Sequence, residues 1–276
     1  MKKKEVGEIK EGKEVKENGG DVAAFFDLDG TLLPAPSLEN SLWGTLRYRK
    51  SIGVRNYLAW LREAMRLLPR GIAQIANGNK AYLRGVRAAE AEALAIPAFF
   101  PEAVWRVSWH VERGHRIVIV SGTLEPLAWR AARLLAAELA TRGLTARVDV
   151  FATQLETAAR VCTGRILGEA MFGEAKARAM RRFCMSRGIE LERCFAYGDS
   201  ANDRWMLEAV GRPTAVNPAD DLARMAQRSG WPVLWWGEEK IFTQSSRSAQ
   251  RPLCSWSAQM SFNEVQIAAT KRECWR

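Results

Sequence analysis

Residues 22–31 read Val22-Ala23-Ala24-Phe25-Phe26-Asp27-Leu28-Asp29-Gly30-Thr31 and join an apolar run to a polar turn. Five consecutive apolar residues are typical of a strand covered on both faces of a parallel sheet. Asp27 and Asp29 are two residues apart, so their side chains point to the same side of an extended backbone. Gly30 then permits a tight turn. The stretch predicts a buried strand whose carboxyl end presents two carboxylates.

Two later stretches also place polar residues directly after an apolar run. Ile117–Val120 precedes Ser121-Gly122-Thr123, and Cys194–Tyr197 precedes Gly198-Asp199-Ser200. In an open parallel sheet, the carboxyl ends of the strands form a common crevice. We therefore expect these polar residues to lie beside the two carboxylates of the first strand.

The segments between these strands have helical patterns, so strands and helices alternate along the chain. Such alternation predicts an α/β fold, a doubly wound parallel sheet with helices on both faces. Helices are predicted within 41–92 and at 101–113, 125–142, 174–187 and 203–210, a third strand at 148–152, and a turn at Thr163-Gly164-Arg165. Residues 1–20 are rich in Lys, Glu and Gly and are expected to be a disordered tail. Residues 237–276 have no clear period and receive no predicted structure.

The chain of 276 residues carries a formal charge of +10, and most of the excess is local. Residues 41–92 hold ten basic and three acidic residues, a net +7. A basic excess fits an acidic substrate, an anionic membrane or nucleic acid. Composition alone does not choose among these partners; together with the motifs described below, it favours an anionic substrate, with a membrane surface second and nucleic acid a distant third.

Several classes of protein are excluded by composition. No uncharged apolar run reaches the roughly 18 residues that cross a bilayer. The N-terminus lacks the apolar segment of a secretory signal. Five cysteines without CxxC spacing indicate a reducing compartment, neither a disulfide framework nor a zinc site. We expect a cytoplasmic location.

The carboxylates of the predicted strand ends indicate a particular chemistry. Asp27 and Asp29 repel each other unless a cation lies between them. With Asp199 they supply three hard oxygen ligands, which suit Mg²⁺ better than zinc. A carboxylate can also act as a nucleophile toward phosphorus, while a second carboxylate transfers protons.

These residues resemble a known family. Asp27-Leu28-Asp29-Gly30-Thr31, Ser121-Gly122-Thr123, Lys176 and Gly198-Asp199-Ser200-Ala201-Asn202-Asp203 are similar to the four ordered motifs of the haloacid dehalogenase (HAD) superfamily. The resemblance covers about residues 22–236. The insertion between the first two motifs and the stretch Gly173-Glu174-Ala175-Lys176 resemble its phosphoserine phosphatase-like branch, subfamily IB.

The resemblance implies a domain plan and a role for each motif residue. A HAD core would comprise residues 21–40 and 93–236, with a helical cap at 41–92 inserted after the first strand. Asp27 would be the nucleophile and Asp29 the acid and base, with Ser121 and Lys176 binding phosphate. Asp27, Asp29, Asp199 and Asp203 would form the Mg²⁺ site, Asp29 through its backbone carbonyl and Asp203 by orienting a metal-bound water or Lys176. Gly122, Asn202, Glu39 and Arg84 are the further candidates for substrate contact.

The sequence departs from the phosphoserine phosphatase pattern at three places. Gly30 and Thr123 replace the residues usual in those motifs, and Glu39 lies later than the usual substrate-binding Glu. These departures argue against phosphoserine as the substrate, although not against phosphatase chemistry. We therefore expect a Mg²⁺-dependent phosphomonoesterase that forms an aspartyl-phosphate on a small phosphorylated metabolite, as a monomer or homodimer that does not bind nucleic acid.

Two alternatives stay open at this point. The first is a phosphotransferase, in which the phosphoryl group passes to an acceptor alcohol. The second is a phosphatase of lipid-derived phosphates whose basic cap associates with a membrane. It draws on the segment 55–70, in which Trp60, Leu61, Leu67 and Leu68 stand among arginines, a pattern that fits an interfacial helix as well as a cap helix.

Overall fold

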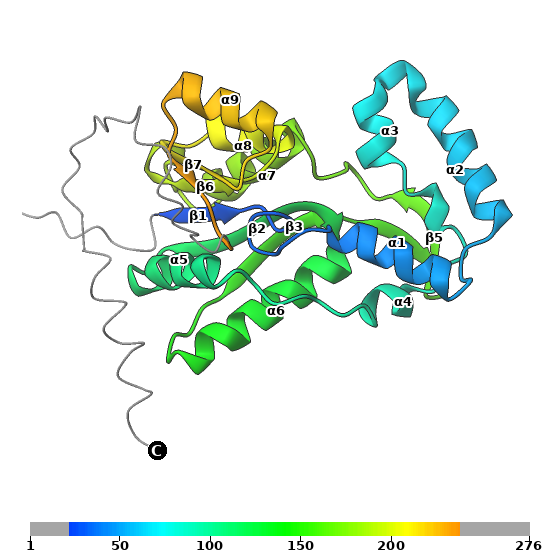
Figure 1. Ribbon diagram of the computed structural model, residues 1–276, viewed down its shortest axis with the longest axis horizontal. Coiled ribbons are helices and arrows are strands. Elements are labelled where there is room, and N and C mark those ends of the chain that lie inside the picture. The colour runs from blue at the N-terminus through cyan, green and yellow to red at the C-terminus, as the bar shows by residue number, and fades with distance from the viewer. Residues whose placement is uncertain (1–21, 238–276) are drawn as a thin grey trace, which may run out of the picture. The chain divides into compact units, whose positions relative to one another are not determined.

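The computed structural model describes residues 22–237 and is built around a six-stranded parallel sheet (Figure 1). The strand order is β3-β2-β1-β6-β7-β8. The strands are β1 Ala23–Phe26, β2 Arg116–Leu124, β3 Val148–Thr153, β6 Phe195–Gly198, β7 Arg212–Val216 and β8 Val233–Leu234. The predicted tail 1–20 and, apart from Gly237, the predicted tail 237–276 lie outside the described residues.

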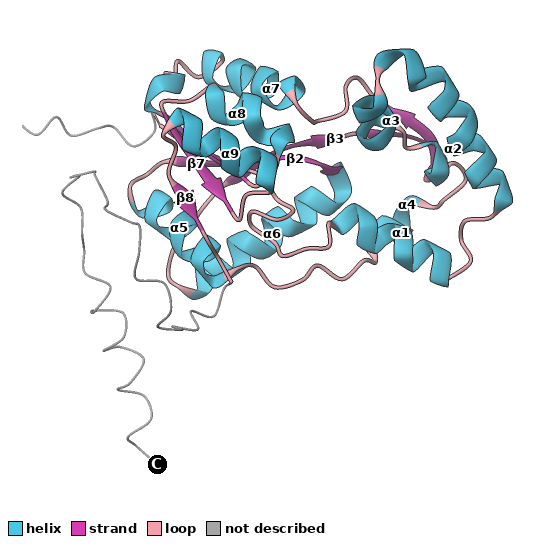
Figure 2. Cartoon of the chain, turned by 45° about the horizontal axis from the view of Figure 1, so that its top comes forward, coloured by secondary structure: helices cyan, strands magenta, loops and turns pink. Residues whose placement is uncertain are grey.

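Helices cover both faces of this sheet, as predicted (Figures 1 and 2). Alternation along β1 sends Ala24 and Phe26 into one apolar core and Ala23 and Phe25 into the other. The first core is closed by α5 (Pro101–Glu112) and α6 (Glu125–Thr141). The second is closed by α7 (Glu174–Met185), α8 (Arg204–Glu208) and α9 (Asp220–Ser229).

The order of the strands reverses beside β1. The chain proceeds from β1 to β2 and β3 on one side, and it then returns to place β6 on the other side of β1. The backbone N–H of Asp27 donates a hydrogen bond to the Tyr197 carbonyl of β6 across 2.9 Å. Ligands of open α/β sheets bind at the carboxyl ends of the strands at such a reversal. The fold therefore directs attention to the residues that follow β1 and β6.

Four helices are inserted between β1 and the crossover helix α5. They are α1 (Leu38–Tyr48), α2 (Val54–Leu67), α3 (Ile72–Gly78) and α4 (Ala88–Glu92), with 3₁₀ turns η2 (Leu68–Arg70) and η3 (Ala81–Leu83) between them. Pro69 and the positive φ of Gly71, +98°, separate α2 from α3. No helix among residues 22–237 is long and apolar enough to cross a membrane.

The predicted turn at Thr163-Gly164-Arg165 is wrong, because these residues belong to a strand. β4 (Leu155–Ala158) and β5 (Val161–Ile166) form an antiparallel hairpin, which the sequence did not reveal. Main-chain hydrogen bonds of 2.9 and 2.8 Å join Cys162 of β5 to Gly85 and Val86, beside the inserted helices. Gly164 keeps a positive φ of +81°, the local signal that suggested a turn.

Other element boundaries also differ from the sequence prediction. Ser121-Gly122-Thr123 lies within β2, which was expected to end before it, and the pairing register with β3 shifts between Val120 and Leu124. Thr153 Oγ1 donates to the Gly122 carbonyl across 2.7 Å and holds this irregular end in place. The helix expected at 203–210 is divided into a 3₁₀ turn, η5 (Ala201–Asp203), and the short α8. β7 and β8 were not predicted, and another 3₁₀ turn, η4 (Leu191–Arg193), precedes β6.

A fully buried histidine lies where α5 meets the sheet. His110 Nε2 is 2.9 Å from the Tyr197 hydroxyl, and His110 Nδ1 is 2.8 Å from His115 Nδ1. Burial lowers the pKa of His110 to about 2, and the charge of His115 adds to this effect. His110 is therefore neutral in the folded protein at every ordinary pH, and its role is structural.

This buried histidine predicts a loss of stability in mild acid. The unfolded chain binds a proton at residue 110 below about pH 6.5, whereas the folded chain does not, so stability falls as pH decreases from that value. The His110→Gln variant should lose up to about 1.4 kcal/mol per pH unit of this dependence. Urea unfolding at pH 7 and pH 5 measures the difference, and equal slopes in both proteins would contradict the prediction.

Candidate active site

A buried lysine joins two carboxylates at the reversal of strand order. Lys176 Nζ lies 2.5 Å from Asp27 Oδ1 and 2.5 Å from Asp203 Oδ1. The exposed fractions of these side chains are 3%, 7% and 0%. Asp27 follows β1, Lys176 lies in the first turn of α7, and Asp203 ends the 3₁₀ turn after β6. Three distant segments of sequence therefore meet at one ammonium group.

Asp203 is held by a full set of hydrogen bonds. Its Oδ2 accepts from the backbone N–H groups of Asp199 and Ser200, at 3.2 and 3.1 Å, and from the Ser200 hydroxyl at 2.9 Å. Its Oδ1 accepts from Lys176. This carboxylate therefore fixes both the loop after β6 and the position of the lysine.

Asp199 completes an acidic cluster with Asp27 and Asp203. One carboxylate oxygen from each of the three residues lies within 4.8 Å of the others. Gly30 lets the Asp199 carboxylate approach the turn after β1, since a β-carbon at residue 30 would lie 2.2 Å from Asp199 Oδ2. Gly30 also has a φ of +90°, which favours glycine. Glycine is thus required at residue 30 both by the close approach of Asp199 and by the positive φ of the turn.

Asp29 takes a separate position from this cluster. Its Oδ1 accepts a hydrogen bond of 2.8 Å from the backbone N–H of Leu38, the first residue of α1. A carboxylate at a helix N-terminus satisfies one of the free N–H groups there. Asp29 therefore connects the turn after β1 to the start of the inserted helices.

The carboxyl groups of the site have altered proton affinities. Burial raises the pKa of Asp27 to about 7, an effect that Lys176 opposes and Asp203 reinforces. Burial raises the pKa of Asp199 to about 9, and the charge of Asp27 adds to it. Burial also raises the pKa of Asp29 to about 6. Burial alone would lower the pKa of Lys176, but Asp203 and Asp27 raise it above its usual value.

Ser121 is buried at the same end of the sheet. The pairing of Phe26 with Ile119 places Ser121 of β2 level with the residues that follow β1. Ser121 Oγ accepts from the Thr123 N–H across 3.2 Å. The hydroxyls of Thr31 and Thr123 are buried and have no hydrogen-bond partner among the described residues. Sequence reasoning quoted both threonines in motifs without assigning them a role.

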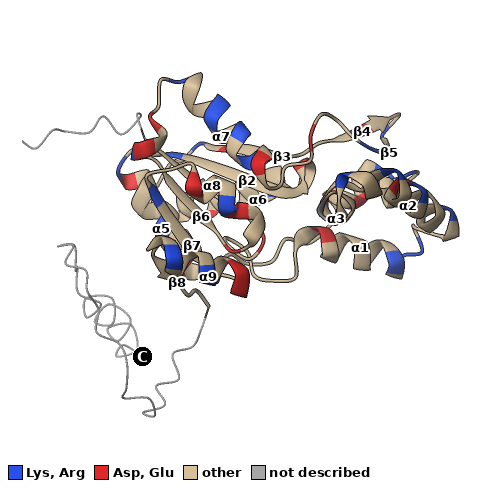
Figure 3. Cartoon of the chain, turned by 90° about the horizontal axis from the view of Figure 1, so that it is seen from above, with Lys and Arg blue, Asp and Glu red and all other residues tan. Residues whose placement is uncertain are grey.

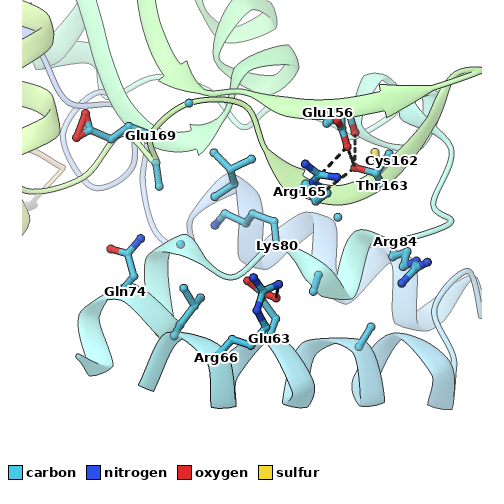
Figure 4. Close-up of a pocket in the computed structure, with 18 of the residues that line it drawn as sticks. Glu63, Arg66, Gln74, Lys80, Arg84, Glu156, Cys162, Thr163, Arg165 and Glu169 are labelled. Atoms are coloured by element: carbon cyan, nitrogen blue, oxygen red, sulfur yellow. Dashed lines mark hydrogen bonds and ion pairs between the residues drawn. The ribbon is translucent and has the colours of Figure 1, made fainter. Parts of the chain in front are cut away.

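A large cavity of about 1630 Å³ lies between the inserted helices, the β4–β5 hairpin and the start of α7 (Figure 4). Among the predicted substrate residues, Arg84 and Asn202 line it, while Ser121, Gly122, Lys176 and Glu39 do not. Gly173 and Ala175, which lie within three residues of Lys176 in the sequence, line the cavity on the side of the core domain. The cavity therefore reaches the start of α7 and the turn after β6, although Asp27, Asp29, Asp199 and Asp203 are not among the residues that line it.

Glu39 is bound within the inserted helices. Both of its carboxylate oxygens lie 2.6 Å from Lys80 Nζ, and the Tyr82 hydroxyl donates to Oε1 across 2.7 Å. Lys80 is 3% exposed and lines the cavity, where Figure 4 shows it between α2 and the hairpin. Sequence reasoning missed Lys80, because one lysine in a strongly basic segment carries no local signal.

Together these residues can perform phosphoryl chemistry. A buried carboxylate held against a fixed ammonium group is a candidate nucleophile, and the same ammonium offers charge to an anionic group. The donor set of Asp27, Asp199 and Asp203 is all oxygen and carries more negative charge than Lys176 balances. Such a set fits a hard divalent cation.

Comparisons with known proteins agree with this geometry. The sequence matches the model of the haloacid dehalogenase-like hydrolase family over residues 24–208. A Streptomyces azureus protein named "Inhibition of morphological differentiation protein" is 33% identical over 233 residues, covering 77% of each chain. A Mycobacterium tuberculosis protein named phosphoserine phosphatase SerB1 is 31% identical, covering 76% of this chain and 70% of its own.

A solved structure shows the same fold. The crystal structure of a Bordetella pertussis protein of unknown function is 28% identical, with a TM-score of 0.59, and the match covers 78% of this chain and 98% of that one. The family match spans all four motifs, from the strand before Asp27 to the helix after Asp203. The chain belongs to the haloacid dehalogenase-like hydrolases, as a phosphatase of that family.

Proposed function

We propose that the protein hydrolyses phosphate monoesters of small metabolites through an aspartyl-phosphate on Asp27, with Mg²⁺ as cofactor. The observation that carries the proposal is Lys176, buried between the Asp27 and Asp203 carboxylates at 2.5 Å from each. The lysine directs one oxygen of Asp27 and lowers the electrostatic cost of bringing a phosphate dianion to a carboxylate.

In the first half of the reaction, a carboxylate oxygen of Asp27 attacks phosphorus. The bond between phosphorus and the alcohol oxygen breaks, and the electron pair leaves with that oxygen. The Asp29 carboxyl group donates its proton to the departing alkoxide. Lys176 and Ser121 hold the phosphoryl oxygens during this transfer. The products are a free alcohol and a phosphorylated Asp27.

In the second half, water attacks the phosphorus of the acyl phosphate. The Asp29 carboxylate takes a proton from this water, the bond between phosphorus and the Asp27 oxygen breaks, and inorganic phosphate leaves. Both carboxyl groups return to their starting states. In this proposal the hydrogen bond that Asp29 accepts from the Leu38 N–H would orient its carboxyl group for these proton transfers.

Asp27 and Asp199 would hold Mg²⁺ through their side chains, and Asp29 would do so through its backbone carbonyl. The cation would supply positive charge that offsets the repulsion between the phosphate and the carboxylates. Asp203 already accepts four hydrogen bonds, so we assign it to positioning Lys176 and the loop after β6.

We propose that the inserted helices act as a cap that binds the part of the substrate beyond the phosphate. Lys80 and Arg84 line the cavity and present positive charge there. Glu39 and Tyr82 hold Lys80 in place. The substrate would therefore carry a polar or anionic group in addition to its phosphate.

Replacement of the nucleophile tests the mechanism. Asp27→Asn should lower kcat for an aryl phosphate by at least about a thousandfold, because an amide cannot attack phosphorus as a carboxylate does. Asp149→Asn, at a half-buried carboxylate of β3, is the matched control and should retain activity. After acid quenching, labelled phosphate should remain on residue 27 of the unaltered protein and be released by hydroxylamine. Activity that survives in Asp27→Asn would refute the mechanism.

The contact between Gly30 and Asp199 tests the metal assignment. In Gly30→Ala the new methyl group displaces the Asp199 carboxylate, so the Kd for Mg²⁺ in calorimetry should rise by about tenfold or more. Gly143→Ala is the control, since Gly143 has a similar φ of +77° but no atom within 4 Å of the added methyl group. An unchanged Mg²⁺ affinity in Gly30→Ala would show that Asp199 is not a ligand.

Replacement of Lys80 tests its role in the cavity. Lys80→Met should raise KM by about tenfold for substrates with a second anionic group, and it should change kcat less, because the lysine lies away from the reacting atoms. Lys50→Met, at an exposed lysine, is the control. Lys80→Met leaves the Glu39 carboxylate without its partner, which lowers stability by itself. The double variant Glu39→Gln, Lys80→Met removes that charge, so a rise in KM that persists in it reports lost substrate binding. Equal KM values across all substrates would refute this role.

A further inference from the structure

An unusual row of apolar side chains faces solvent along α2 and the turn that follows it. Leu58, Met65 and Leu68 are 60%, 61% and 62% exposed. The full row consists of Val54, Tyr57, Leu58, Leu61, Met65 and Leu68, which we call the apolar stripe. Its residues recur at intervals of three and four, the spacing of one helix face. A continuous exposed apolar row on a folded protein indicates a surface that contacts something.

The apolar stripe is separate from the face of α2 that packs against the protein. Ala64 and Leu67 are the buried residues of α2. Leu67, which the sequence grouped with exposed interfacial residues, therefore belongs to the interior. Met65 and Leu58, which were not in that group, are exposed in its place. The helix therefore has two apolar faces, one packed against the protein and one exposed at the surface.

A row of arginines runs beside the apolar stripe. Arg55, Arg62 and Arg66 follow it at about 100° around the helix, and Arg70 continues the row in η2. Figure 3 shows basic residues repeated along α2. Arg66 pairs with Glu63 at 3.1 Å, while Arg55, Arg62 and Arg70 have no acidic partner among the described residues. Three exposed positive charges are thus available to an outside partner.

We propose that this face of α2 docks on the surface of an anionic lipid bilayer. Helices that lie in the membrane interface combine an exposed apolar face with basic residues on the adjoining face. The stripe would enter the boundary between headgroups and acyl chains, and the arginines would contact lipid phosphates. This docking does not depend on the proposed hydrolysis, and it requires no membrane-spanning helix.

Charge complementarity favours a bilayer over a second copy of the chain. In an antiparallel two-fold contact through the apolar stripe, the arginine row of one copy would face the arginine row of the other. Such a contact places like charges together and leaves three arginines without partners. An anionic bilayer offers a dense layer of negative charge to every arginine in the row.

The position of the arginine row determines how the protein would be oriented on the bilayer. Arg55, Arg62, Arg66 and Arg70 also line the large cavity, whereas Leu61, Met65 and Leu68 do not. Leu58 of the stripe also lines the cavity, and the arginines lie between the cavity and the rest of the stripe. A bilayer that contacts the stripe would bring its headgroups to the rim of this cavity.

Vesicle flotation of the full chain tests the proposal. The protein should float at low ionic strength with vesicles of phosphatidylcholine and phosphatidylglycerol, and not with phosphatidylcholine alone. Leu61→Ser, Met65→Ser, Leu68→Ser should weaken this partitioning by about tenfold or more. Arg55→Gln, Arg62→Gln, Arg70→Gln should weaken it by roughly a hundredfold.

Matched control variants remove similar groups from the core domain. Arg181→Gln, Arg182→Gln, Arg228→Gln removes the same charge from α7 and α9, and Leu134→Ser, Met185→Ser removes exposed apolar side chains from α6 and α7. Both controls should float as the unaltered chain does. The stripe variant should keep its activity toward a soluble aryl phosphate, because its three residues do not line the cavity.

Four outcomes would overturn the proposal. They are absence of flotation by the unaltered chain, equal flotation with both vesicle types, flotation of the stripe variant at the level of the unaltered chain, and equal losses in the control variants. Sedimentation velocity adds a fifth. A dimer that the stripe substitutions convert to a monomer, without vesicle binding, would assign this face to self-association.

Discussion

The buried contact of Lys176 with Asp27 and Asp203 is the constraint on which the rest of the site depends. An ammonium group without solvent is stable only beside negative charge, and each carboxylate at this depth needs the lysine in return. The three residues come from β1, α7 and the turn after β6, so the ion pairs are satisfied only when these elements are correctly assembled. The geometry that we propose for catalysis and the correct assembly of the fold are therefore one requirement here.

Elements were predicted correctly from the sequence where a local pattern of residues requires a particular environment. The apolar run before Asp27 and the β-branched run before Ser121 can be accommodated only in a sheet covered on both faces, and the structure has that sheet. The acidic pairs at strand ends converge because parallel strands end together. Gly30 was predicted from the turn, yet its decisive neighbour is Asp199, 169 positions later in the chain, which no local pattern reveals.

Sequence reasoning failed where partners from elsewhere decide the structure. The hairpin formed by β4 and β5 is short and polar, and it owes its pairing partly to the backbone at Gly85 and Val86. Lys80 is buried because Glu39 and Tyr82 surround its ammonium group, not because of its own neighbours in the chain. Similarly, the periodicity of α2 contains two apolar faces, and only packing shows which of them is buried.

The hairpin formed by β4 and β5 also links the inserted helices to the core. It leaves the core after β3, is bonded by its main chain to the segment between η3 and α4, and returns to the core just ahead of α7. Main-chain hydrogen bonds thus join β5 directly to the segment of the inserted helices. The seven residues 167–173 then connect β5 to the first turn of α7, which carries Lys176. The inserted helices and the central ion pairs are thereby joined by one continuous main-chain path of two hydrogen bonds and a short segment.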